Sequence, residues 1–267
     1  MSIAMYKVEE IRKDNKKKVV EFLKKDVTRH VFAVYDIQYE PTYTKMYGAF
    51  EHESLKGYIL TYTATEFPSV ILEGENDAAR ILIGYMPKNN FILHAPQHLL
   101  PIIEEKFSDA RCYVEIWMLV RTNQATIFKS SQVRRLSGLE DASKLMTLLS
   151  TREDRPRRNL DKYVEWTRRM PMYGVFINEE LVSYAGSFIQ LPQVWMIGGV
   201  YTHPSHRNKG YATFATSAIT EEALKNADAA SLFVRADNYP AIRVYEKIGY
   251  KKVGEKLWVD VGTGLKP

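Results

Sequence analysis

The chain has 267 residues and a formal net charge of +5, and 45% of its residues are hydrophobic and 26% charged. These values are typical of one large or two small folded domains and exclude a disordered chain. The positive charge is too small and too dispersed to argue for nucleic-acid binding by itself.

Targeting signals are not visible in the sequence. No run approaches the ~18 apolar residues of a membrane span, and the N-terminus has no continuous apolar stretch typical of a signal peptide. Cys112 is the single cysteine, so no internal disulfide can form. We therefore expect a cytoplasmic protein that does not bind membranes.

The first half predicts a helix followed by strands and further helices. Apolar residues on one face predict the opening helix, and runs bounded by turn residues predict the strands. The expected elements are a helix at 14–25, strands at 46–52, 56–63 and 69–72, a helix from 78, a strand at 91–95, a helix at 97–107 and a strand at 111–120.

The second half predicts the order β, α, α, β, β, β, α, β, α, β. Ser137 and Glu140 have the spacing of a capping box at the start of its first helix. A hairpin meander beside alternating strands and helices favours an α/β fold, a mixed sheet covered by helices. The elements are expected at 132–136, 139–149, 160–169, 172–178, 181–189, 193–202, 213–224, 229–235, 239–248 and 250–259.

The two halves have a similar order of elements, which indicates a tandem arrangement. The boundary falls at about 121–130, and we expect domains at 1–125 and 126–267. Between strand and helix the second half has a basic loop, whereas the first half has the acidic segment 73–77. Because carboxylates would repel a phosphate there, only the second half is expected to bind one.

The basic loop lies between the strand that ends near Pro204 and the helix that follows. Its sequence has the form R-x-x-G-x-A, with Arg207, Gly210 and Ala212 at the named positions. Gly210 permits a positive φ or a close approach of the backbone to a ligand. Backbone N–H groups and a helix N-terminus directed at one point favour phosphate, although an ordinary turn is the alternative for so short a motif.

A second motif follows at the spacing N-x-x-A-x-x-x-Y-x-x-x-G-[FY]. Asn238 is placed to cap a helix, Ala241 and Tyr245 share one helix face, and Gly249 is placed to end the helix before Tyr250 begins a strand. Each of these features is common alone. Their joint spacing after a candidate phosphate loop is much less common.

Together, the two motifs resemble the signature motifs of the GNAT superfamily of N-acetyltransferases. The wording of 199–204 with 232–234 is similar to the branch of glycine N-acyltransferase-like proteins, in which the N-terminal half is a degenerate copy of the same fold. The resemblance covers about 132–259. It implies a mostly antiparallel sheet with splayed central parallel strands, here 196–202 and 231–235, and acetyl-CoA as cosubstrate without a metal.

The resemblance also implies which residues contact the cosubstrate. Backbone groups of Val200 and Thr202 would pair with the pantetheine arm, and N–H groups from Asn208 to Thr213 would hold the pyrophosphate. The residues expected to contact acetyl-CoA are Val200, Tyr201, Thr202, Arg207, Asn208, Lys209, Gly210, Tyr211, Ala212, Thr213, Asn238 and Tyr245.

The implied reaction is direct attack of a primary amine on the thioester in a ternary complex. Tyr245 is the candidate acid for the leaving thiolate, because a phenol pKa of about 10 is close to a thiol pKa of about 8.5. Asp237 is the candidate base, acting through water. Glu153 and Asp154 could attract a cationic amine. His203 and His206 are expected to be loop residues.

The acceptor itself is not predicted, beyond a small molecule or peptide that carries an amine. An aromatic pocket for it could come from Trp166, Tyr173, Tyr184, Phe188 and Trp195, although period-two spacing places some of them toward the core. Two alternatives stay open. One is a non-catalytic CoA-binding regulatory or scaffold protein, and the other is nucleic-acid binding through Lys16–Lys18 and Arg155–Arg158.

Overall fold

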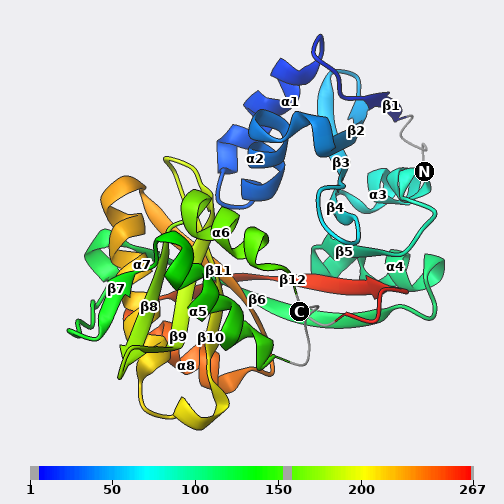
Figure 1. Ribbon diagram of the computed structural model, residues 1–267. Helices are drawn as coiled ribbons and strands as arrows, with labels where there is room; N and C mark the ends of the chain where they lie inside the picture. Colours follow the sequence, from blue (N-terminus) through cyan, green and yellow to red (C-terminus); the bar gives the residue numbers. More distant parts are fainter. Residues whose placement is uncertain (1–5, 153–157, 266–267) are drawn as a thin grey trace. The chain divides into compact units, whose positions relative to one another are not determined.

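The computed structural model describes residues 6–152 and 158–265. The chain divides into two compact units. Unit 1 is formed by the residues up to Ile116 together with those from Glu255 onward, and unit 2 by Trp117–Gly254. A sheet with helices packed on it forms each unit (Figure 1). A domain boundary at 125/126 stays a prediction.

Unit 1 is built on strands that are antiparallel except for one central parallel pair, β4 and β5. Its strand order is β1-β2-β3-β4-β5, and β12 pairs with β5. Helices α3 and α4 cover one face over an apolar core. The elements are β1 (Lys7–Glu10), α1 (Lys16–Leu23), α2 (Val31–Tyr39), β2 (Thr44–Glu51), β3 (Ser54–Tyr62), β4 (Ser69–Gly74), α3 (Asn76–Leu82), β5 (Phe91–Ala95), α4 (Leu100–Lys106) and β6 (Arg111–Arg121).

Helix α2 is the main element that the sequence pattern does not predict. Its residues are apolar on nearly all sides, so no 3.6-residue alternation of apolar and polar positions marks it. Five of its nine residues are buried. The short strand β1 is also unpredicted, because it is a four-residue edge strand of partly exposed, mostly charged residues.

Unit 2 repeats this arrangement with the strand order β7-β8-β9-β10-β11, followed by β6. Its strands β7 to β10 form an antiparallel meander, and β10 pairs with β11 in parallel. The elements are β7 (Val133–Arg135), α5 (Gly138–Ser150), α6 (Leu160–Arg169), β8 (Met172–Ile177), β9 (Glu180–Gln190), β10 (Trp195–Thr202), α7 (Tyr211–Asn226), β11 (Ala229–Arg235), α8 (Tyr239–Ile248) and β12 (Lys251–Val261).

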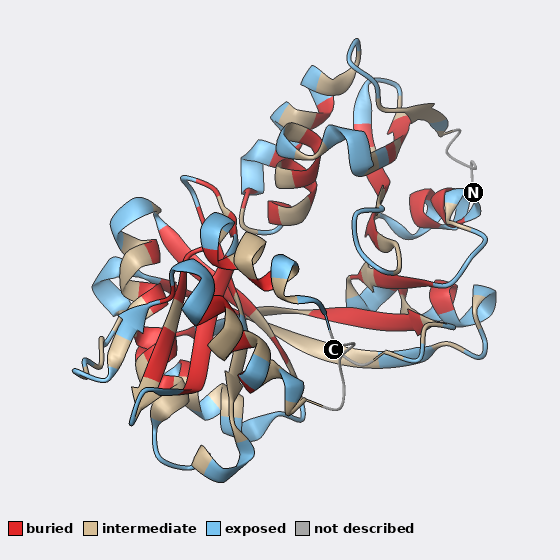
Figure 2. Cartoon of the chain, in the orientation of Figure 1, coloured by how far each residue is buried: buried red, intermediate tan, exposed pale blue. Residues whose placement is uncertain are grey.

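Helices cover both faces of the unit 2 sheet, and its central strands are largely buried (Figure 2). Helices α5 and α6 pack on one face over a core that includes Leu145, Tyr163 and Tyr184. Tyr173 pairs with Ala185, the residue next to Tyr184, so its side chain points to the opposite face. There it contacts Glu222 of α7. We call the face that α5 and α6 cover the α5/α6 face.

The start of α5 differs from the expected capping box, and that prediction is wrong. Ser137 occupies the N-cap position without a side-chain cap hydrogen bond. Instead, the backbone N–H of Ser137 donates to Asp141 Oδ2 at 2.8 Å. Arg134 also donates to both carboxylate oxygens of Asp141, at 2.6 and 2.7 Å, which helps to hold the side chain there.

The order of helices and strands in the first part of the chain, β1 to β6, is the same as the order from β7 to β12. Both sets read β, α, α, β, β, β, α, β, α, β. This confirms the predicted mixed α/β fold with a mostly antiparallel sheet flanked by helices.

Candidate functional site

The site begins where strands β10 and β11 separate. They pair only at Trp195 with Ala230 and at Met196 with Ser231. Both strands continue for several residues beyond these pairs, with Thr202 ending β10 and Arg235 ending β11. The facing edges of the two strands are therefore open, which is the splayed arrangement expected here.

A bulge interrupts β10 inside the open segment. The pairing of β10 with β9 shifts between Gly198 and Tyr201, and Gly199 has a φ of +67°. A Cβ atom on Gly199 would lie 2.7 Å from the hydroxyl oxygen of Tyr184, so the turn and this hydroxyl both require glycine. The bulge redirects backbone groups around Val200 away from the regular ladder.

The end of β10 directs its backbone groups alternately to its two sides. The N–H of His203 donates to the Val182 carbonyl on β9 at 2.9 Å. Because successive residues of a strand point their N–H and C=O groups to opposite sides, those of Thr202 point away from β9, toward the open edge. The predicted pairing of Thr202 with an extended ligand uses this edge.

The loop between β10 and α7 has two residues with left-handed backbone. The φ of Asn208 is +61° and the φ of Gly210 is +82°. Gly210 is also the N-cap of α7, which has no side-chain cap hydrogen bond, and α7 begins at Tyr211. The N–H groups of the first turn, up to Thr213, are thus presented at an exposed helix N-terminus, a geometry that suits a phosphate.

Basic groups gather beside this loop. Arg207 Nε donates to the Thr202 carbonyl at 3.4 Å, and its guanidinium lies 5.9 Å from the centre of the Tyr201 ring. The guanidinium of Arg152 lies 5.3 Å from the same ring, whose hydroxyl shares a 2.8 Å hydrogen bond with Thr151. Lys209 is exposed in the loop. Positive charge is therefore concentrated beside Tyr201 at the end of β10 and in the loop that leads to the helix.

Helix α8 has the two ends that the second motif predicts. The Asn238 side chain accepts from the N–H of Ala241 at 3.3 Å, which confirms the cap. Gly249 ends the helix with a φ of +106°. A Cβ atom there would collide with the Gln124 carbonyl, so only glycine fits. Asn238 thus already has a capping role, and its contact with a ligand stays a prediction.

Tyr245 is buried on α8, and α8 packs against α7. Its ring meets that of Tyr250 edge-on, with 6.0 Å between the ring centres. Burial raises the pKa of the Tyr245 hydroxyl above its ordinary value of 10.0. The hydroxyl therefore stays protonated throughout the physiological pH range, as a proton donor must.

Asp237 is bound to a neighbouring arginine. Arg235 Nε donates to Asp237 Oδ1 at 2.9 Å, and a second guanidinium nitrogen contacts Oδ2. The hydrogen bond from Arg235 lowers the pKa of this exposed carboxyl. A lowered pKa weakens a carboxylate as a base, and its catalytic role stays a prediction. Glu153 and Asp154 lie outside the described residues.

The five aromatic residues considered for an acceptor pocket do not lie together. Tyr184 and Phe188 contact the positions of Gly199 and Gly198. Tyr173 points toward α7, as described above, and Trp195 precedes Met196 and so faces away from Gly198. Trp166 is partly buried on α6 against Tyr163. The strand alternation therefore leaves Tyr184 and Phe188 beside the bulge.

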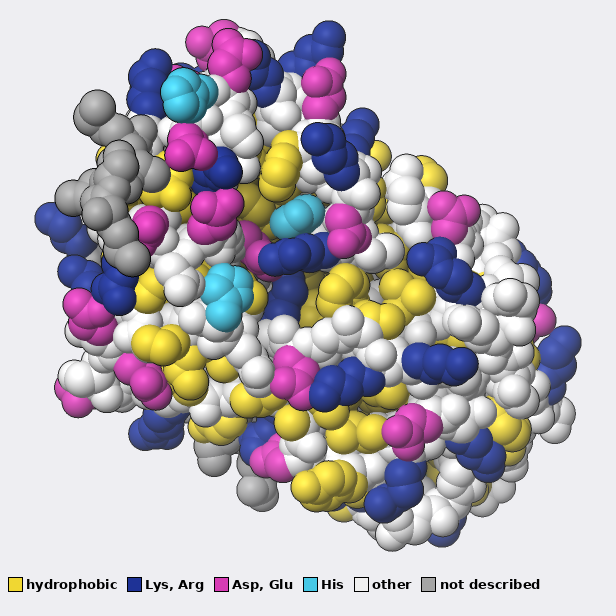
Figure 3. Space-filling view, turned by 180° about the vertical axis from the view of Figure 1, so that it is seen from behind, with side chains coloured by type: hydrophobic (Ala, Val, Ile, Leu, Met, Phe, Trp, Pro, Cys, Tyr) yellow, Lys and Arg dark blue, Asp and Glu magenta, His cyan; other side chains and the backbone are white. Residues whose placement is uncertain are grey.

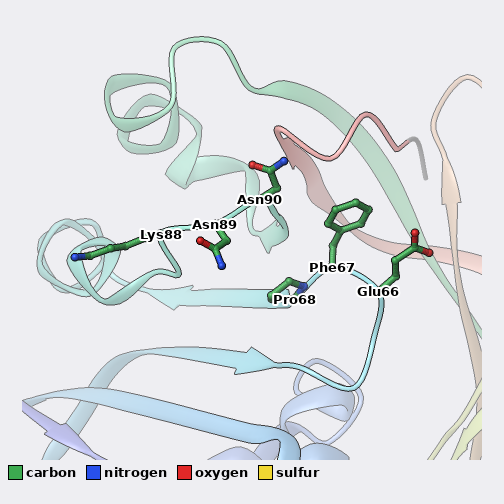
Figure 4. A pocket seen from close by; sticks show the side chains of 6 residues that line it. All are labelled: Glu66, Phe67, Pro68, Lys88, Asn89 and Asn90. Atoms are coloured by element: carbon green, nitrogen blue, oxygen red, sulfur yellow. The ribbon is translucent and has the colours of Figure 1, made fainter.

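Other surface features do not include the predicted site residues. A hollow lined by Glu66, Phe67, Pro68 and 88–90 lies in unit 1 and includes none of the predicted site residues (Figure 4). On the face seen in Figure 3, Lys and Arg side chains alternate with Asp and Glu. Mixed charge of this kind on that face differs from the continuous basic patch that nucleic-acid-binding proteins present. Arg155–157 of the basic cluster lie outside the described residues.

Within 6–152 and 158–265, no three His, Cys, Asp or Glu side chains are grouped so that they could hold a metal ion. In the same part of the chain, no helix is both long and apolar enough to cross a membrane.

Comparison with known proteins identifies similar folds. The family model described as FR47-like protein matches 172–259, which includes the splayed strands, the loop and α8. No curated protein matches the chain. A Drosophila protein of known structure is 12% identical and has a TM-score of 0.74, with 96% of this chain and 99% of that chain covered.

Two further solved structures bear acetyltransferase names. A GCN5-related N-acetyltransferase from Sphaerobacter thermophilus is 10% identical with a TM-score of 0.65, and 98% of each chain is covered. A tandem GNAT protein from the clavulanic acid biosynthesis pathway is 12% identical with a TM-score of 0.61, covering 97% of this chain and 100% of that one. At such identities these likenesses establish the fold, which matches that of GNAT acetyltransferases.

Proposed function

We propose that this chain is an N-acyltransferase that transfers an acetyl or other acyl group from acyl-CoA to a primary amine. The observation that carries the proposal is the uncapped N-terminus of α7 behind Gly210, joined directly to the open edge of β10. The first feature suits the pyrophosphate and the second suits the extended pantetheine arm, with its amide groups. The match of the FR47-like family model to 172–259 supports the same assignment.

The bulge supplies the environment for the thioester in this proposal. The amine nitrogen attacks the thioester carbonyl carbon, a C–N bond forms and the C–S bond breaks. A backbone N–H near Val200 stabilises the negative charge that develops on the carbonyl oxygen. The nitrogen loses one proton to water or a base, and the products are an amide and the free thiol of CoA.

Tyr245 is the proposed donor of the proton that the leaving thiolate accepts. Its burial raises the pKa of the hydroxyl, which by itself makes the phenol a weaker acid. A thiolate that leaves into the same low-dielectric surroundings also has a raised pKa. The two groups therefore remain comparable in acidity, and proton transfer between them stays feasible.

A second candidate function is a CoA-binding regulatory or scaffold protein without turnover. The observation that favours it is the ion pair of Asp237 with Arg235, which weakens the candidate base. Release of free thiol from acetyl-CoA in the presence of amines, amino acids and peptides separates the two functions. Turnover with any acceptor excludes the scaffold, and CoA binding without turnover across the whole panel supports it.

The direct test of the donor is calorimetric titration with acetyl-CoA and with CoA. We expect saturable binding of both at micromolar concentrations. Dephospho-CoA, which retains the pyrophosphate, and pantetheine, which lacks it, serve as controls. Pantetheine should bind far more weakly. Absence of binding by acetyl-CoA up to millimolar concentrations would falsify the proposal.

We further propose that unit 1 is a degenerate copy of the same fold. The repeated order of elements supports this, as does the similarity to a solved protein described as a tandem GNAT protein. In unit 1, α3 begins at Asn76 only two residues after β4 ends at Gly74. No basic loop separates them, and Asp77 lies in the first turn of α3.

A further inference from the structure

An aromatic strip borders the bulge on the α5/α6 face of unit 2. We define it as Phe188 on β9, Phe233 on β11 and Trp117 on β6. Strand β10 runs between Phe188 and Phe233, and at this level it carries Gly198, which has no side chain. The strip therefore flanks a bare section of backbone immediately before the bulge.

Phe188 lies over that bare section. On β9, Ser187 pairs with Ile197 and Ile189 with Met196, so Phe188 is the additional residue of a bulge. A Cβ atom on Gly198 would lie 2.5 Å from Phe188 Cε1. The Phe188 residue is nevertheless 42% exposed. An apolar ring is thus in contact with the strand and still accessible to a ligand.

Phe233 and Trp117 form the side of the strip that lies across β10 from Phe188. Because Met196 pairs with Ser231, Phe233 lies on the same face as Gly198, just beyond the last pair of the two strands. The Trp117 ring stacks on Phe233 with 6.3 Å between ring centres and 26° between planes. Trp117 Nε1 donates to Ser231 Oγ at 2.7 Å, which holds the indole in place.

The strip is close to the proposed reaction centre. Gly198 precedes Val200 by two residues, so they lie at most roughly 7 Å apart, since even an extended strand rises only about 3.3 Å per residue and the bulge shortens it. A phenyl-sized group joined by one or two bonds to the reacting carbon or nitrogen spans that length. Aromatic side chains bind such a group by apolar contact and by edge-to-face or offset stacking.

We propose that the aromatic strip binds an apolar group of aromatic size carried by one of the two substrates. The group is either the acyl chain of the thioester or the substituent of the acceptor amine. This inference rests on the proposed N-acyltransferase function and assigns its substrate class.

The experiment has one arm for each source of the apolar group. The donor arm compares phenylacetyl-CoA with acetyl-CoA, and the acceptor arm compares 2-phenylethylamine with ethylamine in the presence of saturating CoA, all by calorimetry. We expect about tenfold tighter binding of the aromatic ligand in one arm, a ratio that corresponds to about 1.4 kcal/mol. The arm that shows the difference identifies the substrate that carries the group.

Variants connect the effect to the strip. Phe188→Ala should reduce the tenfold preference to about twofold, and Phe188→Leu should retain part of it. Phe22→Ala, which removes a comparably exposed phenylalanine on α1 of unit 1, should leave the preference unchanged. Binding of CoA itself should stay within twofold in all three variants.

Two results overturn the inference while leaving the proposed function intact. One is normal CoA binding with less than a twofold preference in both arms. The other is a preference that persists in Phe188→Ala. Failure of CoA itself to bind is a different result, because it removes the proposed function and with it the assignment of the strip.

Discussion

Gly210 is the residue at which the backbone of the basic loop turns into α7. Its φ of +82° is costly for any residue with a Cβ atom, although nothing lies closer to that position than Phe214, at 4.0 Å. Gly210→Ala should therefore cost only about 1 kcal/mol of stability, while the added methyl group blocks the approach of a phosphate. We expect at least tenfold weaker CoA binding by calorimetry.

Gly138→Ala is the matched control for this variant. Gly138 has a φ of +73°, no atom within 4 Å of its Cβ position, and a place at the start of α5 in the same unit. Its substitution should lower stability by a similar amount without weakening CoA binding. Equal loss of CoA affinity in both variants would mean that strain, and not the phosphate contact, explains the effect of Gly210→Ala.

Tyr245 tests the chemical step. Removing its hydroxyl in Tyr245→Phe should lower kcat by about 10- to 100-fold, toward the lower end of general acid effects, while the Kd for CoA stays within twofold. Because burial raises the pKa of Tyr245, its ionisation should cause no loss of wild-type activity below about pH 10. Thiol release across a pH series measures kcat and its dependence on pH.

The neighbouring Tyr250 provides the control for this substitution. Its hydroxyl shares a 2.8 Å hydrogen bond with Thr220 in the core. Tyr250→Phe should cost about 1 kcal/mol of stability, as loss of a buried hydrogen bond does, with kcat unchanged. An unaltered kcat in Tyr245→Phe would show that another group protonates the thiolate.

At the scale of the element, α2 carries a buried carboxyl that destabilises unit 1 at neutral pH. Burial, with a smaller contribution from Glu40, raises the pKa of Asp36 from 3.8 to about 7. The folded pKa lies above the unfolded one, so the folded state binds the proton more tightly, and stability falls as pH rises from about 4 to about 7. Above pH 7 the Asp36 carboxyl is ionised in both states, and its charge is buried in the folded chain but solvated in the unfolded chain.

Asp36→Asn should therefore stabilise the protein in a pH-dependent way. We expect a gain of up to about 4 kcal/mol at pH 8, and a gain smaller by at least half at pH 5, since the shift of about 3 pKa units is only partly expressed there. Urea unfolding at the two pH values measures the difference. A gain of equal size at both would mean that the variant acts through packing or hydrogen bonding and not through charge.

Most elements were predictable because their signals are local. The helices at 160–169 and 239–248 and the strands at 91–95 and 229–235 coincide with α6, α8, β5 and β11. Alternation, caps and terminal glycines mark such segments within a few residues. Helix α2 escaped prediction because apolar residues also occupy its partly exposed side, so the amphipathic pattern that would have identified it is absent.

For the whole molecule, we expect one CoA per chain. In unit 1 the buried Glu73 on β4 accepts from Arg29 at 2.9 Å and lies 3.6 Å from Lys256 Nζ. Arg29 and Lys256 are therefore already paired with the Glu73 carboxylate. In addition, Asp77 in the first turn of α3 would repel a phosphate. Calorimetry should give a stoichiometry near one, and a reproducible value near two would show that unit 1 also binds CoA.

Local sequence was sufficient for the loop and the second motif. The positive φ of Gly210, the Asn238 cap and the end of α8 at Gly249 follow from what each residue permits in its own backbone. The fold class also followed, because the order of amphipathic helices and alternating strands restricts how a sheet can be covered. The backbone geometry of this strand–loop–helix joint was therefore predictable from the sequence, and its binding of a phosphate stays a prediction.

Only the tertiary structure decided which side chains surround that joint. The bulges at Phe188 and Gly199 shift the pairing of β9 with β10, and a shift of one residue reverses which face a side chain occupies. These shifts place Phe188 over Gly198 and Tyr184 beside Gly199, whereas regular alternation turns Tyr173 and Trp195 to the opposite face. The burial that raises the pKa of Tyr245 likewise depends on packing between elements distant in sequence, which no local pattern encodes.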